Sequence, residues 1–253
     1  GEDYDVREQL ERWERFERRA WTHVDCVVVM SEKDRATASS ARRVEVLANG
    51  VDPVRFQPSA DEPEPGRLLF IGSFAHLPNL LALDFFLREI WPRLDTNGIK
   101  LHVIAGSKHE YFYNLHRERL SFTLAYPGLM LEGFVSDVRG AYRRAEIVIA
   151  PLLASAGTNI KIMEAMAMGK AIVSTSGGVN GLDELSPGSD ILVHDDPESF
   201  ANAVGMLQAD PGERRRIEER ARRTAEAVYG WNAIAARQDL LYQSLMSLSA
   251  VQR

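Results

Sequence analysis

The chain has 253 residues, of which 45% are hydrophobic, and its formal net charge at pH 7 is −6. This length suits one large domain, or one domain and part of another, and the apolar fraction is enough for a hydrophobic core. The acidic charge and the lack of a basic stripe argue against nucleic acid as a partner. The one cysteine, Cys26, excludes an intrachain disulfide and indicates a reducing compartment, and no run reaches the ~18 to 20 apolar residues of a membrane span.

The first 57 residues predict a helix, a strand, a second helix and a second strand. Apolar residues recur at helical spacing over residues 5–22, and residues 24–30 and 44–47 are short runs typical of strands. Ser31 is the expected cap of the second helix, with Asp34 three residues on. These elements are too few for a closed α/β domain and resemble the end of one. Residues 58–66, rich in proline and acidic residues, predict a linker.

Beyond residue 66, uniformly apolar strands alternate with helices. This pattern predicts an α/β fold with a doubly wound parallel sheet, covered by helices on both faces. The expected strands are 67–72, 101–105, 129–131, 147–150, 171–173 and 191–193. The expected helices are 80–94, 110–120, 137–144, 160–168, 198–207, 212–228 and a long final helix, 231–248.

Residues 151–181 are the part of this pattern with the most chemical content. A polar loop, 155–159, leads from a buried strand into a short helix, and such a helix start is a ready anion site, most often for phosphate. The helix is apolar nearly all round, and its two charges, Lys161 and Glu164, share one face. They could form an internal salt bridge. We favour a second interpretation, in which Lys161 neutralises a phosphate and Glu164 accepts hydrogen bonds from sugar hydroxyls, because charges seldom enter a buried helix without a partner.

Other loops at the same edge of the sheet complete a nucleotide-sized site. Ligands of doubly wound sheets bind beyond the carboxyl ends of the strands, where several of the expected loops carry glycine. The helix start at Pro78-Asn79 offers a second anion site, and nearby His76 is either a polar loop residue, which we favour, or a phosphate donor. The chain has no G-x-G-x-x-G after a strand, no phosphate-loop motif and no metal-ligand spacing of histidines. These absences argue against a dinucleotide dehydrogenase, a phosphate-loop NTPase and a dedicated metal site.

Several motifs resemble those of a known family. The chain has Asn-Gly-Val-Asp at 49–52, Phe-Ile-Gly-Ser at 70–73, Glu-Gly-Phe-Val at 132–135 and the long run 157–175. With Trp231 opening the last helix, they resemble the nucleotide-sugar-binding half of GT-B glycosyltransferases, in particular the retaining family-4 (group 1) type. The resemblance covers nearly the whole chain, and the segment from Lys161 to Gly169 is its most specific part.

The resemblance implies a domain organisation. Residues 67–230 would form the Rossmann-like, C-terminal nucleotide-sugar-binding domain of a GT-B enzyme. Residues 1–57 would be a partial remnant of the N-terminal, acceptor-binding domain, joined by the linker 58–66. Residues 231–253 would form a long C-terminal crossover helix.

The resemblance also implies roles for individual residues. Glu164 matches the glutamate that holds the ribose hydroxyls of the donor, and Lys161 matches a basic residue near its diphosphate, so these two are the expected catalytic residues. Ala156 stands where the family usually carries another glutamate, which positions the donor sugar. The expected donor-nucleotide-binding residues are Gly72, Ser73, Asn79, Gly133, Phe134, Gly157, Thr158 and Asn159.

The implied function is transfer of a sugar from a nucleoside diphosphate sugar to an acceptor, with retention and without a metal or other cofactor, in polysaccharide or glycolipid synthesis. The alternatives are a non-catalytic nucleotide-sugar-binding or interaction module, or a GT-B nucleotide-sugar epimerase. Expected partners are the donor, an acceptor of unknown identity and a missing N-terminal domain, with no nucleic acid. The expected location is cytoplasmic, where the full-length protein could associate peripherally with the inner face of the membrane. The chain alone is expected to be weakly active or inactive, because the acceptor side of the cleft belongs to the N-terminal domain.

Overall fold

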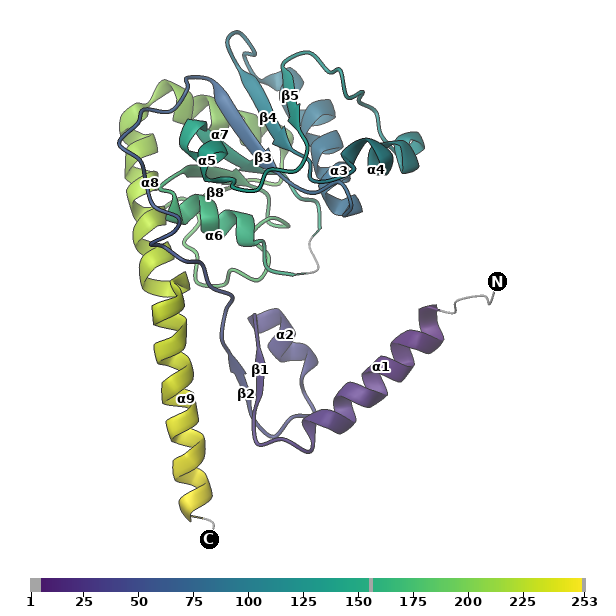
Figure 1. Ribbon diagram of the computed structural model, residues 1–253, viewed down its shortest axis with the longest axis vertical. Coiled ribbons are helices and arrows are strands. Elements are labelled where there is room, and N and C mark those ends of the chain that lie inside the picture. The colour runs from purple at the N-terminus through teal and green to yellow at the C-terminus, as the bar shows by residue number, and fades with distance from the viewer. Residues whose placement is uncertain (1–5, 155–156, 252–253) are drawn as a thin grey trace. The chain divides into compact units, whose positions relative to one another are not determined.

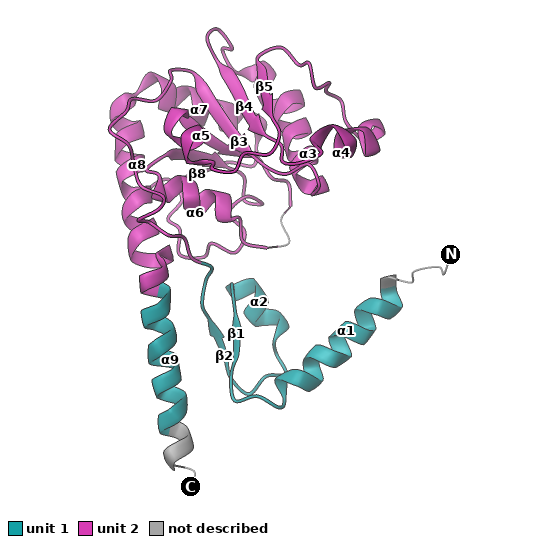
Figure 2. Ribbon diagram, viewed as in Figure 1, with its two compact units in different colours: residues 1–49, 234–253 teal, residues 50–233 magenta. Residues whose placement is uncertain are grey.

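The computed structural model of the protein describes residues 6–154 and 157–251 (Figure 1). The chain divides into two compact units, one of residues 1–49 and 234–253 and a larger one of residues 50–233 (Figure 2). The larger unit is a three-layer α/β structure, so the predicted fold class is confirmed.

The larger unit is built on a parallel sheet. In the described part of the chain this sheet has six strands in the order β5-β4-β3-β6-β7-β8, and every neighbouring pair is parallel. The order reverses between β3 and β6, which is where doubly wound sheets form a ligand-binding crevice. The strands are β3 (Arg67–Ile71), β4 (Lys100–Ile104), β5 (Leu129–Glu132), β6 (Ile147–Ala150), β7 (Ala171–Ser174) and β8 (Leu192–Val193).

Helices cover both faces of this sheet (Figure 1). On one face α3 (Leu77–Phe85) continues into the π-helical turn η1 (Phe86–Ile90), which contacts α7 (Pro197–Ala209). On the other face α6 (Ile160–Ala167) packs against α8 (Pro211–Thr224), and α5 (Arg139–Arg144) contacts β3. Strands β3, β4, β6 and β7 are almost continuously buried because both of their sides are covered, whereas exposure alternates along the edge strand β5.

Several helices differ from their predicted extents. The helix expected over 80–94 begins at Leu77, with Pro78 in its first turn, and ends in a 3₁₀ turn at Trp91–Arg93. Pro92 has no N–H to continue the helical hydrogen bonds, so the helix stops there. The helix expected over 110–120 is shorter, α4 (His109–Leu115), and is followed by a 3₁₀ turn, and α8 gives way to a π-helical turn at Ala225–Tyr229.

The smaller unit contains α1 (Val6–Trp21), β1 (Val27–Val29), α2 (Glu32–Thr37), β2 (Val44–Val46) and most of α9 (Trp231–Val251). β1 and β2 are parallel and joined through α2, as in a βαβ unit. The predicted cap is confirmed, because Ser31 Oγ accepts a hydrogen bond of 3.2 Å from the Asp34 N–H. None of the helices in the described ranges combines the length and apolarity needed to cross a bilayer.

One loop at the carboxyl edge of the sheet carries backbone strain. Lys108, between β4 and α4, has φ 54° and ψ 30°, and among the described non-glycine residues it alone has a positive φ. This left-handed conformation brings the Cβ atom too close to the backbone and costs about 1 kcal/mol for residues other than glycine. Gly106, two residues earlier, adopts a similar φ of 78° without that cost.

We therefore expect Lys108→Gly to raise the free energy of unfolding by up to ~0.5 kcal/mol, measured by urea denaturation, because relief of about 1 kcal/mol of strain outweighs the freedom that glycine adds to the unfolded chain. The matched control is Ser107→Gly, at the neighbouring position where φ is not positive. There glycine only adds freedom to the unfolded chain, so the control should lose about 0.5 to 1 kcal/mol. Destabilisation by Lys108→Gly equal to that of the control would contradict the assignment of strain to Lys108.

Candidate functional site

The predicted site residues lie in loops that follow strands of the larger unit or in the helices that these loops lead into, with Asn79 in α3 and Lys161 and Glu164 in α6. Gly72 and Ser73 follow β3, Gly133 and Phe134 follow β5, and residues 157–159 lead into α6. Because all the strands are parallel, these loops meet at one edge of the sheet. β3 and β6 are neighbours at the point where the strand order reverses, so the loops after them face one crevice.

Lys161 joins the two sides of this crevice. Its Nζ donates a hydrogen bond of 2.9 Å to Asn79 Oδ1 in the first turn of α3, and Asn79 Nδ2 donates to the Ser73 carbonyl at 2.9 Å. The Lys161 ammonium also lies 5.6 Å from the centre of the Phe70 ring, a cation–π distance. Three residues predicted for the site, Ser73, Asn79 and Lys161, are thus brought together by direct hydrogen bonds.

The electrostatic environment of Lys161 is unusual for a lysine. The residue as a whole is half-buried, but its ammonium group is largely surrounded by protein, and this burial lowers its pKa to about 8. Within the described ranges no carboxylate forms an ion pair with it; its partners are the Asn79 amide and an aromatic ring. A cation that is desolvated without a counter-charge favours the approach of an anion.

Glu164 has a separate set of partners on the same helix. Its Oε2 accepts a hydrogen bond of 3.1 Å from the Tyr142 hydroxyl, and the same hydroxyl lies 3.0 Å from the Lys161 carbonyl oxygen. Burial raises the pKa of Glu164, while the Tyr142 hydrogen bond and the positive charge of Arg55 act in the opposite direction. No ion pair between Lys161 and Glu164 occurs among the described residues, so the internal salt bridge considered for the sequence is not what the structure shows.

An open pocket of about 440 Å³ lies between the start of α3 and the start of α6. Two helix N-termini therefore meet at one pocket, each leaving N–H groups of its first turn without helical acceptors and contributing a partial positive charge. The pocket is lined by His76, Pro78, Asn79, Leu152, Ala154, Gly157, Thr158, Asn159, Ile160 and Lys161. Residues 155 and 156, including the notable Ala156, lie outside the described residues.

Close backbone approach explains two of the glycines at this edge. A Cβ atom on Gly72 would lie 2.9 Å from Asn79 Cγ, so a side chain there would displace the residue that holds Lys161. A Cβ atom on Gly178, after β7, would lie 2.1 Å from Ser174 Oγ. The Gly178 carbonyl accepts a 2.6 Å hydrogen bond from Asn159 Nδ2, which fixes the residue that precedes α6.

Gly133 and Phe134 lie at the same edge but do not line the 440 Å³ pocket. The Gly133 carbonyl accepts a hydrogen bond of 3.2 Å from the Gly106 N–H, which joins the loops after β5 and β4. Phe134 is 72% exposed, so its ring is available for stacking against a flat ligand. The structure therefore places these two residues beside the site without bringing them into contact with Lys161.

Tyr142 and Arg55 were not identified from the sequence. Tyr142 is completely buried on α5, and Arg55 lies in the segment before the predicted linker. Tyr142 lies on a helix, and Arg55 lies in the long segment after β2 of the smaller unit, so neither belongs to the loops that follow the strands of the larger sheet. Only the packing of α5 against α6 brings the Tyr142 hydroxyl to Glu164, so no local signal could have revealed it.

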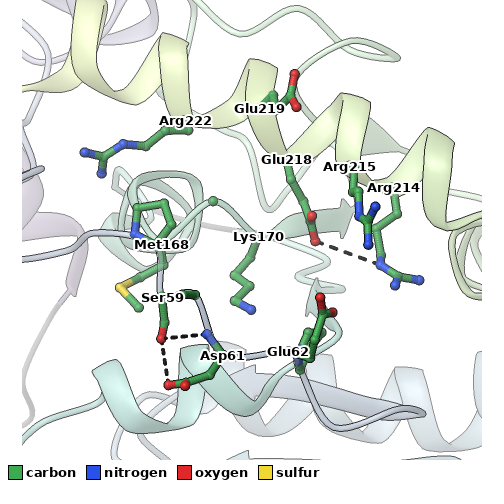
Figure 3. A pocket seen from close by; sticks show the side chains of 14 residues that line it. Ser59, Asp61, Glu62, Met168, Lys170, Arg214, Arg215, Glu218, Glu219 and Arg222 are labelled. Atoms are coloured by element: carbon green, nitrogen blue, oxygen red, sulfur yellow. Dashed lines mark hydrogen bonds and ion pairs between the residues drawn. The ribbon is translucent and has the colours of Figure 1, made fainter.

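A second pocket, of about 330 Å³, lies at the amino edge of the sheet (Figure 3). Lys170, immediately before β7, points into it and donates hydrogen bonds to the carbonyls of Arg143 and Ala145. Glu218 and Arg214 of α8 face the same space and lie 4.0 Å apart. Positive and negative side chains alternate around this pocket, so it shows no preference for an anion. Within residues 6–154 and 157–251 no cluster of His, Cys, Asp and Glu could hold a metal ion.

The fold and the crevice define a class of protein. A doubly wound α/β unit with a long C-terminal helix is the arrangement of the nucleotide-sugar-binding part of GT-B glycosyltransferases. Residues 65–210, more than half of the chain, match the family described as glycosyl transferases group 1, and the chain belongs to that family. No curated protein matches the sequence.

Solved structures with this fold include several glycosyltransferases. Sucrose-phosphate synthase from Thermosynechococcus elongatus is 22% identical with a TM-score of 0.72, over 94% of this chain and 62% of that one. S. aureus TarM, as a G117R mutant in complex with Fondaparinux, alpha-GlcNAc-glycerol and UDP, is 14% identical with a TM-score of 0.74, over 95% and 48%. HepE from Anabaena, in complex with UDP-glucose, is 15% identical with a TM-score of 0.65, over 96% and 71%. The chain thus spans less than two thirds of the length of the sucrose-phosphate synthase and of TarM.

The lowered pKa of Lys161 predicts a pH dependence of stability. The pKa of a lysine in the unfolded chain is about 10.5, whereas burial lowers the pKa of Lys161 in the native state to about 8. Between these values the unfolded chain binds more protons, so Lys161 makes the free energy of unfolding rise with pH. We expect this rise to be roughly 1 to 3 kcal/mol smaller in Lys161→Met, measured by urea denaturation at pH 7.5 and 10.

Lys170 contributes to the same pH range, because burial also lowers its pKa. It is present in both proteins, so its contribution cancels in the difference between wild type and Lys161→Met. An identical pH dependence in the two proteins would contradict the burial of the Lys161 ammonium.

Proposed function

We propose that the crevice between α3 and α6 binds the diphosphate of a nucleoside diphosphate sugar, and that the protein transfers the sugar to an acceptor with retention. No metal or other cofactor takes part in this proposal. The observation that carries it is the ammonium group of Lys161, which is largely buried, has no carboxylate partner among the described residues and lines a pocket where two helices begin. Membership of the group 1 glycosyltransferases supports sugar transfer as the reaction class.

The physical basis of catalysis is stabilisation of the leaving group. When the bond between the sugar and the diphosphate breaks, negative charge develops on the diphosphate oxygen. The Lys161 ammonium and the N-termini of α3 and α6 are already oriented toward this position, so little reorganisation is needed as the charge appears. Asn79 fixes Lys161 in place through its 2.9 Å hydrogen bond.

The rest of the donor extends from the diphosphate toward two neighbouring regions. We assign the ribose hydroxyls to the Glu164 carboxylate, an acceptor-only group when ionised. We assign the base to the loop of Gly133 and Phe134, where the exposed Phe134 ring offers a stacking surface. The TarM and HepE structures were obtained with UDP and UDP-glucose respectively, so a uridine nucleotide is the first donor to test.

We also propose a setting for the reaction. The product would be a polysaccharide or glycolipid made in the cytoplasm, with peripheral association at the inner face of the membrane; the unpaired Cys26 supports a reducing compartment. Residues 1–253 alone would bind the donor but transfer sugar slowly or not at all. The support for this is that the chain covers only 62% of the sucrose-phosphate synthase and 48% of TarM.

A thermal-shift panel of UDP, GDP, ADP and their sugars tests donor binding. We expect one nucleotide series to raise the melting temperature, because a ligand that binds only the native state stabilises it. Lys161→Met should weaken that binding by about 10-fold or more, since hydrogen bonds to charged groups contribute ~1.5 to 3 kcal/mol. Titration calorimetry with the selected nucleotide measures this ratio.

Lys170→Met is the matched control. It removes another buried lysine, but at the opposite edge of the sheet, so it should alter stability without altering nucleotide affinity. Equal loss of affinity in both variants would indicate a general loss of structure. No shift with any nucleotide would contradict the proposal and favour a non-catalytic interaction module.

A further inference from the structure

We propose that Tyr142 is a positioning residue of the donor site, holding the Glu164 carboxylate and the first turn of α6 in the orientation that the ribose hydroxyls require. This inference rests on the proposed function and adds to it a residue that would act only through Glu164. Tyr142 belongs to α5, and its side chain is completely buried, so it is not itself available to a ligand.

The Tyr142 hydroxyl lies where it can hold both parts of α6 that matter for the site. It is 3.1 Å from Glu164 Oε2 and 3.0 Å from the Lys161 carbonyl oxygen. A phenol has one proton to donate, so it is shared between, or alternates between, these two acceptors. The one contact fixes a side chain of the site, and the other fixes the backbone from which the Lys161 side chain extends.

Glu164 needs an external partner to be well oriented. A glutamate side chain has several rotatable bonds, and ordering it costs up to about 1.5 kcal/mol in lost rotamer freedom. Lys161, three residues before Glu164, is hydrogen-bonded to Asn79. Among the described residues Lys161 forms no ion pair with Glu164. The Tyr142 hydrogen bond therefore supplies an order that the helix itself does not provide.

Tyr142 is in turn fixed by the segment that leads into the larger unit. The Phe56 ring packs edge-on against the Tyr142 ring, with centroids 6.5 Å apart. Arg222 of α8 donates hydrogen bonds to the carbonyls of Phe56 and Pro53, and also to the carbonyl of Ala167, the last residue of α6. Both ends of α6 are thus anchored, the first turn by Tyr142 and the last by Arg222.

The charged and titratable groups that face Glu164 are few, so the effect of removing the hydroxyl has a definite sign. Among the described residues they are Tyr142 from α5 and Arg55 from the segment beside Phe56, while Lys161 on the same helix is hydrogen-bonded to Asn79 instead. A hydrogen bond donated to the ionised carboxylate stabilises that form and keeps the pKa of Glu164 lower than burial alone would. Without the hydroxyl, Glu164 takes up its proton at a higher pH.

The test is Tyr142→Phe, which removes the hydroxyl and keeps the ring, with UDP, GDP and ADP as probes in titration calorimetry from pH 5 to 8. At pH 7.5 we expect the Kd of the bound nucleotide to rise roughly 2- to 12-fold, the range for loss of one hydrogen bond. The acid limb of the binding profile should also move to higher pH. Titration of the nucleotide itself is the same for both proteins and cancels in the comparison.

The matched control is Tyr113→Phe. Tyr113 is also buried, and its hydroxyl donates a 2.7 Å hydrogen bond to the Phe122 carbonyl, away from α6. This control should lose a similar amount of stability and leave both the Kd and the pH profile unchanged. In a Glu164→Gln background, Tyr142→Phe should have little further effect on the pH profile, because the titrating carboxyl is absent.

Two results would overturn the inference in distinguishable ways. If the wild type binds a nucleotide and Tyr142→Phe matches it in Kd and pH profile, Tyr142 is a structural core residue only. If the wild type binds no nucleotide, the proposed donor site itself is wrong, and the role of Tyr142 is wrong with it.

Discussion

The proposed donor crevice depends on a cation that is buried between two helix starts. Lys161 reaches from α6 to Asn79 in the first turn of α3, and this hydrogen bond connects the two halves of the sheet where the strand order reverses. Burying an ammonium group is unfavourable unless it is compensated, and the compensation in this structure comes from an amide oxygen and an aromatic face. The site is therefore electrostatically incomplete until an anion arrives, which is the property that a diphosphate-binding site requires.

The rest of the larger unit keeps this cation in position. Gly72 has no side chain, so Asn79 can pack against the backbone that follows β3. Asn159 is tied to Gly178 after β7, and the two ends of α6 are tied to Tyr142 and Arg222. Each of these contacts joins α6 to a different element, so the orientation of Lys161 and Glu164 is a property of the whole unit.

The two pockets of the larger unit show that the arrangement of charge matters more than the presence of charge. The pocket around Lys170 is lined by more charged groups than the proposed donor crevice, but positive and negative side chains face each other across it. The Lys170 ammonium is also occupied by two backbone carbonyls. The crevice around Lys161 lies between two helix N-termini and contains a cation without a carboxylate partner among the described residues, so it has a net preference for anions.

The sequence by itself determined the fold class, and it placed the loops of the proposed site at one edge of the sheet. Apolar strands that alternate with helices can only be satisfied by a parallel sheet covered on both faces, and parallel strands place their following loops together. The run around Lys161 and Glu164 was enough to predict a largely buried helix that carries two charges. Local patterns predicted helix ends less well. At Pro92 a 3₁₀ turn replaced the α-helix that was expected to continue to residue 94.

Only the tertiary structure decided what these charges contact. A spacing of three residues allowed a salt bridge between Lys161 and Glu164, yet packing directs Lys161 to Asn79 and Glu164 to Tyr142. These partners lie 82 and 22 residues away in the sequence. Asn79 was expected at the same edge of the sheet as Lys161, but neither hydrogen bond follows from periodicity or spacing. A local pattern reports which face of a helix is buried, but the identity of the group on the other side depends on how distant elements pack, and that information exists only in the folded chain.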